Sequence, residues 1–341
     1  MNDMMTTDAP AALNGIKVVD LTQFEAGPSC TEALAWLGAD VVKVEEPKRG
    51  EPGRWGFTDM PGVDSTYFVY YNLNKRAVTC NLKTEEGKVL LTRMLEQADV
   101  VIENMAPGTF ARLGFDYERL KELNPRIIFA QVKGFSPEGP HGDYLSFDMI
   151  AQATGGTFAI NGMPDQPPIR PGATMGDTGT GMLMAVSILG AYVRRLRTGQ
   201  GEHLQVAMQD AILHYIRNAF AYMERSGGGA APRAGSKTVG GGWPPIGVFP
   251  CKGGGPNDYV YTWALAQVLE HKGEKTQAGK LRNDWLEKHP RSAEAYKWKL
   301  NKARKAEDDD YTKILGEAIK EHPTNGSFIF MRAAYKQNEE D

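Results

Sequence analysis

The fold is decided by Gly15-Ile-Lys-Val-Val-Asp-Leu21, an apolar run that predicts a buried strand. A loop at Thr22–Pro28 follows it, then a helix at Ser29–Leu37 with Ser29 as its possible N-cap, and then a second strand at Ala39–Glu45. This strand–helix–strand order predicts a parallel sheet with ligands at the carboxyl ends of its strands.

The same alternation continues along the chain. Further strands are predicted at Ala77–Leu82, Asp99–Asn104 and Arg126–Val132. Between the first two of these, an amphipathic helix is predicted at Thr84–Ala98, and another helix opens at Ser146–Ala153. The apolar residues expected to face inward from the amphipathic helix are Val89, Leu90, Leu91, Met94 and Leu95. The fold class is therefore α/β with a Rossmann-like parallel sheet.

A dinucleotide-binding protein is the natural alternative for such a beginning. That class needs a G-x-G-x-x-G turn after the first strand, and the loop Thr22–Pro28 contains only Gly27. Binding of NAD or FAD is therefore not expected.

One acid stands among glycines in Arg170-Pro-Gly-Ala-Thr-Met-Gly-Asp-Thr-Gly-Thr-Gly-Met182. An apolar run with helical spacing follows at Met182–Leu196, so Asp177 is predicted at or just before a helix N-terminus, where unpaired N–H groups favour a negative charge. The surrounding glycines would let another molecule approach the carboxylate. With a reference pKa of about 3.9, Asp177 would be ionised at neutral pH and could act as a nucleophile. The alternative is an N-cap aspartate in a tight turn.

Length and composition restrict the class of protein to which this chain can belong. The 341 residues suggest two domains, and 41% apolar with 24% charged residues is typical of a soluble globular protein. A formal charge of −3 gives no nucleic-acid signature. The three widely spaced cysteines form neither a disulfide framework nor a metal-binding pattern. The polar, acidic segment Met1–Asp8 is not expected to be a signal peptide, and no apolar run is long enough to span a membrane. A cytoplasmic protein is therefore expected.

Several ordered motifs resemble one family. They are Gly176-Asp-Thr-Gly-Thr-Gly-Met182, Arg197-Thr-Gly-Gln-Gly-Glu202 and Val206-Ala-Met-Gln-Asp-Ala211, within a likeness from about Leu13 to Tyr261. Together they resemble the family III CoA-transferases (CaiB/BaiF type), closest to the formyl-CoA:oxalate and acetyl-CoA:oxalate group. The resemblance implies that coenzyme A passes from an acyl-CoA to a carboxylic acid, with oxalate or another small dicarboxylate as acceptor. It also implies an aspartyl anhydride and thioester at Asp177, a homodimer, and coenzyme A as a substrate and not a permanently bound cofactor.

The resemblance also implies positions that contact coenzyme A. These are Phe24, Ala26, Cys80 through its main chain, Asn104, Met105 and Arg112. The cations Lys48, Arg49 and Arg54 stand in a loop with Pro and Gly; they fit either a solvated surface or a set of ligands for the phosphates of coenzyme A.

Further residues are implied to act beside Asp177. Glu25 stands where many relatives in the oxalate group carry Gln, and Asp148 matches an acidic position near the active site, although an acid in the first turn of a helix is also common. A glycine loop that covers the acid is matched by Gly240, Gly241 and Gly242; a plain linker is the alternative.

Two other functions remain open. Acyl-CoA racemases resemble this chain too, but as a family they place His where this chain has Phe147, which cannot exchange a proton. The other alternative is an inactive CoA-binding body whose helical tail binds a protein partner.

Three parts are expected along the chain: a large domain at 1–207, a linker helix and partial small domain at 208–261, and an all-helical segment at 262–341. A helical run at Met208–Met223 and a hairpin at Gly247–Tyr261 belong to the second part. The third part is rich in charge, and its helices are predicted at Trp263–Lys272, Thr276–Lys288, Ser292–Ala306 and Tyr311–Glu321. A Leu-Glu-Lys-His-Pro sequence ending at Pro290 and an Ile-Lys-Glu-His-Pro sequence ending at Pro323 give it a weak likeness to tetratricopeptide repeats, with His289 and His322 as capping residues.

Overall fold

The computed structural model describes residues 10–57, 62–236, 248–250, 259–261 and 310–322, with scattered positions between 276 and 303. The chain divides into two compact units. The first comprises Met1–Thr157 and Pro171–Tyr215, and the second comprises Phe158–Arg170 and Ile216–Asp341. The expected three-part division at residues 207 and 261 stays a prediction.

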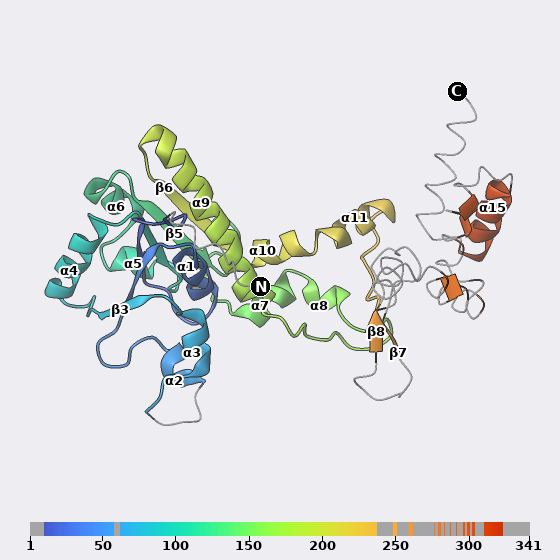
Figure 1. Cartoon of the computed structure of the whole chain (residues 1–341), viewed down its shortest axis with the longest axis horizontal. Helices are drawn as coiled ribbons and strands as arrows, with labels where there is room; N and C mark the ends of the chain where they lie inside the picture. Colours follow the sequence, from blue (N-terminus) through green and yellow to red (C-terminus); the bar gives the residue numbers. More distant parts are fainter. Residues whose placement is uncertain are drawn as a thin grey trace. The chain divides into compact units, whose positions relative to one another are not determined.

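The first unit is built on a six-stranded parallel sheet, in agreement with the α/β prediction (Figure 1). Its strands stand in the order β3-β2-β1-β4-β5-β6, so the direction in which the chain adds strands reverses between β1 and β4. The strands are β1 (Lys17–Asp20), β2 (Asp40–Glu45), β3 (Arg76–Thr79), β4 (Val100–Glu103), β5 (Ile128–Lys133) and β6 (Glu202–Ala207). Strand β6 was not predicted; it lies at the edge of the sheet, and its sequence Glu-His-Leu-Gln-Val-Ala lacks the apolar run of the central strands.

Helices connect these strands and extend beyond them. They are α1 (Ala26–Trp36), α2 (Gly53–Gly56), α3 (Thr66–Tyr71), α4 (Glu85–Leu95), α5 (Thr109–Arg112), α6 (Tyr117–Leu123), α7 (Asp148–Thr154), α8 (Thr157–Ile160), α9 (Thr180–Thr198), α10 (Met208–Tyr215) and α11 (Arg217–Arg225). A π-helical turn, η1 (Met175–Gly179), runs directly into α9.

Both faces of the sheet are covered. Helices α4, α5 and α6 pack on one face, where Leu91, Leu95 and Leu120 join Val101 and Phe129 in the main core (Figure 1). Helices α1 and α9 pack against each other, α1 contacts β2, and α9 contacts β5 and β6. This two-sided burial explains why the four central strands, β2, β1, β4 and β5, are rich in apolar residues, whereas the edge strands β3 and β6 are more exposed.

Two local predictions about helices are wrong. Val89 and Leu90 are 52% and 42% exposed, because the stripe of α4 that packs on the core is formed by Leu91, Met94 and Leu95. Helix α1 begins at Ala26, so Ser29 lies inside the helix, where it is buried, and does not cap it.

The second unit contains the predicted hairpin as antiparallel β7 (Val248–Pro250) and β8 (Tyr259–Tyr261). Helix α15 (Tyr311–Glu321) has the predicted bounds, and Leu315 and Ala318 on it form a small core with Tyr296 and Leu300. The described positions from 276 to 287 and from 296 to 303 are helical, as expected.

Other predictions for this unit lie outside the described residues: Gly240, Gly241, Gly242, His289 and the helix at Trp263–Lys272. The likeness to tetratricopeptide repeats stays a prediction. His322 follows α15, and its Nε2 lies 2.8 Å from the carbonyl oxygen of Arg291, which fits the structural role expected of it. Within the described part of the chain, no helix is both long and apolar enough to cross a membrane.

Candidate active site at the switch point of the sheet

A cleft of about 220 Å³ lies at the carboxyl ends of β1, β4 and β5. The order of strands reverses between β1 and β4, and the loops after them diverge there and leave a crevice. The lining residues are Gln23, Phe24, Glu25, Ala26, Asn104, Met105, Ala106, Pro107, Val132, Lys133, Gly134, Tyr144, Leu145, Ser146, Phe147, Asp177 and Met208. Six of the predicted site residues therefore meet in one place, namely Phe24, Glu25, Ala26, Asn104, Met105 and Asp177, and Phe147 lies there with them.

Asp177 occupies the middle of the π-helical turn η1, immediately before α9. Such turns are rare and frequently occur at functional sites. The interpretation of Asp177 as an N-cap is wrong. The residue before η1 is Thr174, the residue before α9 is Gly179, and neither position shows a side-chain cap.

Asp148 holds this turn in place from α7. Its Oδ1 accepts a hydrogen bond from the Gly176 N–H at 2.9 Å, and the Asp177 N–H lies 3.4 Å from the same oxygen. The Gln152 amide donates to both oxygens of Asp148, at 3.0 and 2.8 Å. Asp148 is 6% exposed and is not among the lining residues of the cleft, so it acts on Asp177 by position and charge.

Glu25 approaches Asp177 from the loop after β1. Its Oε1 accepts hydrogen bonds from the hydroxyls of Thr178, at 2.7 Å, and Thr174. The two threonines stand four residues apart on either side of Asp177, so they hold the Glu25 carboxylate beside it. Sequence reasoning missed both threonines, although their i, i+4 spacing around the acid was a usable signal.

The electrostatics of Asp177 differ from the expectation. Burial, together with the neighbouring charges of Glu25 and Asp148, raises the pKa of Asp177 to about 7. The carboxyl is therefore only about half ionised at neutral pH, and the expectation of full ionisation is wrong. Tyr67 and Tyr71 of α3 share this environment: burial and the charge of Glu25 raise the pKa of both phenols.

The glycines around Asp177 serve packing more than access. A Cβ at Gly176 would lie 2.8 Å from the Asp148 carbonyl oxygen, and one at Gly179 would lie 2.7 Å from the ring of Tyr215. A Cβ at Gly181 would lie 2.5 Å from the Ala26 carbonyl oxygen. Gly176, Gly179 and Gly181 therefore let α7, α10 and α1 approach the turn closely, while a Cβ at Gly172 would meet nothing within 4 Å, and access of a ligand to the carboxylate stays a prediction.

The positions predicted to contact coenzyme A separate into two groups. Asn104 lines the cleft, but its amide is used to join two loops: it accepts from the Gln23 N–H and donates to the Gln23 carbonyl, both at 2.8 Å. Arg112 is exposed and donates to the Pro107 carbonyl and the Thr109 hydroxyl, so it remains near the loop after β4.

Other predicted ligands lie elsewhere. Arg54 pairs with both oxygens of Glu45 at 2.7 Å and with Asp64 at 2.7 Å, so its guanidinium is already occupied and is a poor phosphate ligand. Cys80 is buried, with its thiol directed at the Gly87 carbonyl. Lys48 and Arg49 have exposed side chains outside the residues that line the cleft. Among the described residues, no group of three or more His, Cys, Asp or Glu is placed to hold a metal ion.

The fold and site define a class of protein: a doubly wound α/β protein with a cluster of acids beside a ligand cleft at its switch point. The family model of CoA-transferase family III matches residues 13–327. The chain belongs to this family. The matched range continues past Tyr261, where the recognisable motifs end, so the family match extends further along the chain than the likeness predicted from those motifs.

Relatives and solved structures agree with this assignment. The chain is 44% identical over 264 residues to the formyl-CoA:oxalate CoA-transferase of Streptomyces avermitilis, covering 73% of this chain and 63% of the relative. It is 37% identical over 292 residues to the enzyme of the same name from Escherichia coli O157:H7, covering 80% and 69%. The structure of a CaiB/BaiF family protein from Brucella suis matches with a TM-score of 0.67 and 32% identity, covering 79% of this chain and 72% of that one. The chain thus spans somewhat less than two thirds of the length of the Streptomyces relative.

Proposed function

We propose that this protein transfers coenzyme A from an acyl-CoA to a carboxylic acid, with Asp177 as the nucleophile. The observation that carries the proposal is the position of Asp177: it lines a cleft at the switch point of the sheet, with Glu25 and Asp148 beside it. Membership of CoA-transferase family III supports this reading of the acid.

The reaction consists of four acyl transfers. The Asp177 carboxylate attacks the thioester carbonyl of the donor, which forms a mixed anhydride and releases the CoA thiolate. The thiolate attacks the aspartyl carbonyl, which forms an aspartyl-CoA thioester and frees the first carboxylate. The acceptor carboxylate then attacks this thioester and releases the thiolate again. Finally the thiolate attacks the acceptor carbonyl of the new anhydride, giving the product acyl-CoA and free Asp177.

Each attacking group is an anion, so the chain's task is to position the groups and to keep water away from the intermediates. The first step needs ionised Asp177. Because the pKa of Asp177 in the free protein is about 7, kcat/KM should fall as the pH decreases through 7.

The donor and acceptor follow from the relatives. The formyl-CoA:oxalate CoA-transferases named above suggest formyl-CoA as the donor and oxalate as the acceptor to test first. Phe24 and Phe147 stand edge to face in the cleft with ring centroids 5.8 Å apart, and they offer an apolar wall to a bound thioester.

Phe147 also weakens the racemase alternative. A two-base racemase needs a proton acceptor on each side of the substrate carbon, and the phenyl ring of Phe147 lines the cleft where the racemase family places its histidine. Incubation of a chiral 2-methylacyl-CoA in deuterium oxide tests this directly: a transferase leaves the α-proton in place, and a racemase exchanges it.

The transfer itself is tested by incubating purified protein with formyl-CoA and oxalate and following oxalyl-CoA. Asp177→Asn keeps the size of the side chain but removes its charge, so transfer should be lost. The exposed Asp165→Asn is the matched control and should transfer at the normal rate. Hydroxylamine added during turnover should modify Asp177 only when acyl-CoA is present. Transfer by Asp177→Asn, or trapping at Glu25 or Asp148, would contradict the mechanism.

Binding of coenzyme A has its own test. Arg112→Ala should weaken binding more than about tenfold in calorimetry, corresponding to about 1.4 kcal/mol, because a guanidinium near the loop after β4 is lost. The exposed Arg119→Ala, on α6, serves as the control. Equal affinity for both variants would remove Arg112 from the site.

A further inference from the structure

The loop Thr22–Glu25 is held in an unfavourable backbone conformation next to the cleft. Phe24 has a φ of 62°, one of two positive values at non-glycine residues in the described part of the chain. A residue with a side chain rarely adopts this conformation unless its surroundings impose it. Glu25 follows immediately, so the direction of its carboxylate toward Asp177 depends on the turn at Phe24.

Each residue of this loop is fixed by a side chain from another part of the first unit. The Thr22 N–H donates to Asp20 at 2.8 Å, and the Thr22 carbonyl accepts from the Lys43 ammonium at 2.8 Å. Gln23 is held at both its N–H and its carbonyl by Asn104. The Phe24 N–H donates to Oε1 of Glu51 at 2.8 Å. Glu51 is therefore the side chain that receives the backbone of the strained residue itself.

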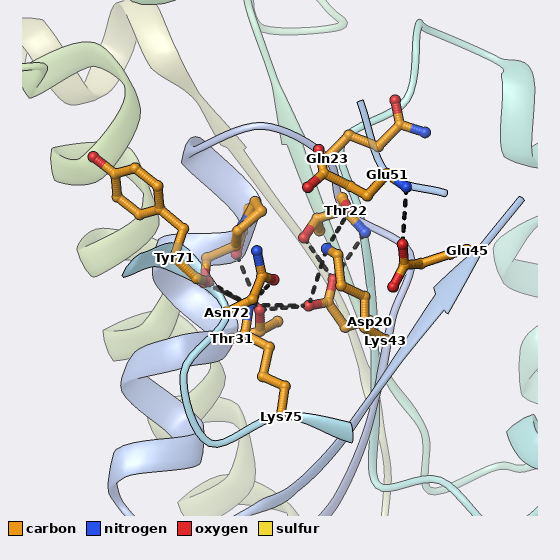
Figure 2. A network of polar contacts seen from close by, with 12 residues as sticks. Asp20, Thr22, Gln23, Thr31, Lys43, Glu45, Glu51, Tyr71, Asn72 and Lys75 are labelled. Carbon is orange, nitrogen blue, oxygen red and sulfur yellow. Dashed lines mark hydrogen bonds and ion pairs between the residues drawn. The ribbon is translucent and has the colours of Figure 1, made fainter. Parts of the chain in front are cut away.

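The side chain of Glu51 is buried and fixed by further hydrogen bonds. It is 2% exposed, and its Oε1 also accepts from the Gly53 N–H at 2.8 Å. Its own N–H donates to Glu45 at 2.8 Å, a bond drawn in Figure 2. Its Oε2 is buried and has no hydrogen-bond partner among the described residues. Burying a carboxylate in this way is costly, and the two backbone N–H groups that it accepts from offset only part of that cost.

We propose that Glu51 is a positioning residue of the transfer reaction: by holding the Phe24 N–H, it fixes the left-handed turn that brings Glu25 next to Asp177. This inference rests on the proposed function.

Several titratable groups surround the carboxyl of Asp177, and one of them is held in place by the turn at Phe24. Glu25 faces it from the loop before α1, Asp148 from α7 and Tyr67 from α3, while Lys133 and Tyr144 line the same cleft. Of the two neighbouring carboxylates, only Glu25 depends on the turn at Phe24. Release of that turn should therefore make Asp177 ionise at lower pH and should misplace the groups that react.

The test compares Glu51→Met with Glu51→Gln. Glutamine keeps an oxygen that can accept from both N–H groups, whereas methionine has a similar length and no such oxygen. For Glu51→Met we expect kcat to fall at least about tenfold, since small displacements of reacting groups are costly. The acid limb of kcat/KM should move to lower pH. Glu51→Gln should keep the wild-type kcat within about threefold and the wild-type pH limb.

Other outcomes overturn the inference. If Glu51→Met melts at a lower temperature but its folded molecules keep the wild-type kcat and pH limb, Glu51 is only structural. If Glu51→Met does not fold, Glu51→Asp is used instead, because it withdraws the carboxylate by one methylene. Glu51→Asp must then show the lower kcat and the shifted pH limb, and a wild-type kcat and pH limb in that variant would overturn the inference.

Failure of the proposed function and failure of the inference about Glu51 give different results. If the Asp177→Asn variant still transfers coenzyme A, the proposed function is refuted. If Asp177→Asn loses transfer but the Glu51 variants keep the wild-type kcat and pH limb, only the inference about Glu51 is refuted. Carbon-13 NMR of carboxyl-labelled aspartate reports the titration of Asp177 without any activity. It should show a lower titration midpoint in Glu51→Met than in Glu51→Gln.

Discussion

The pKa of Asp177 depends on the burial and the neighbouring charges that the fold places around its carboxyl. A carboxyl that titrates near 7 binds a proton more tightly in the folded protein than in the unfolded chain, where its pKa is about 3.8. Between pH 4 and 7 the unfolded chain has lost this proton and the folded protein keeps it. The stability contributed by Asp177 therefore falls as the pH rises through this range, and above pH 7 the full cost remains.

Asp177→Asn should accordingly stabilise the protein while it abolishes transfer. The gain in melting temperature should be small at pH 4 and should grow until about pH 7. It corresponds to at most about 4 kcal/mol for a shift of about three pKa units. Calorimetric melts of both proteins between pH 4 and 8 measure it. A gain that does not depend on pH would show that Asp177 is not raised in pKa.

Glu25 is expected to set part of this pKa. Glu25→Gln keeps an acceptor for the hydroxyls of Thr174 and Thr178 but removes a negative charge beside Asp177. The acid limb of kcat/KM should therefore move to lower pH, and the variant should transfer faster than the wild type at pH 6. A control is Glu118→Gln, an exposed acid on α6, which should leave the limb in place. An unchanged limb in Glu25→Gln would mean that burial and the charge of Asp148 raise the pKa of Asp177 without help from Glu25.

At the scale of elements, the contact between α1 and α9 positions the acids. Helix α9 carries η1 at its beginning, and the residue before α1 is Glu25, so the distance between these helices sets the distance between the two carboxylates. Gly181 permits the close approach, because a Cβ there would lie 2.9 Å from Ser29 Cβ and 3.1 Å from the Cys30 nitrogen.

Gly181→Ala should destabilise the protein by about 1–3 kcal/mol, the usual cost of overpacking, and should lower kcat by separating the acids. Gly190 provides a matched comparison on the same helix, because a Cβ there meets nothing within 4 Å. Gly190→Ala should stabilise the protein by about 0.5–1 kcal/mol. Urea unfolding of both variants decides the matter: equal effects would mean that Gly181 is not a packing position.

At the scale of the whole first unit, a buried ionic cluster joins segments that are far apart in the chain. Asp20 is fully buried at the end of β1, with Lys43 of β2 at 3.7 Å and Lys75 at 3.3 Å (Figure 2). The Lys75 ammonium also donates to the carbonyls of Pro28 and Tyr71. Burial alone would raise the pKa of Asp20, but the two lysines hold it well below its usual range, while burial lowers the pKa of Lys75 to about 8.

Asp20→Asn should therefore be strongly destabilising, by about 3–5 kcal/mol, because it leaves two buried cations without their counter-charge. The exposed pair of Asp40 and Arg76 on the neighbouring strands is the comparison, and Asp40→Asn should change the unfolding midpoint little. Urea midpoints measured at pH 7 test this. Similar midpoints for the two variants would show that the buried cluster contributes no more than a surface pair.

Much of the fold could be read from the sequence because its signals are local. The apolar runs at Gly15–Leu21 and Ala39–Glu45 are strands because both faces of a parallel sheet are buried, and the order of strands and helices then restricts the topology. Asp177 could be selected because it precedes a predicted helix among glycines, whereas Glu25 and Asn104 could be selected only through the resemblance to the family. Strand β6 was not predicted; it lies at the edge of the sheet, where its residues are alternately exposed and half-buried.

What only the tertiary structure decided are the properties that depend on distance. The hydroxyl of Thr178 reaches Glu25 across 153 residues of sequence, and the pKa of Asp177 depends on that approach and on burial. The same reason explains why Arg54 is withdrawn from phosphate binding by Glu45, why Gly181 serves packing, and why Glu51 holds Phe24. The sequence determined which chemical groups are present and on which elements they lie. Packing of those elements decided which groups meet, because charge interactions and hydrogen bonds act over a few ångströms of space, whatever the separation along the chain.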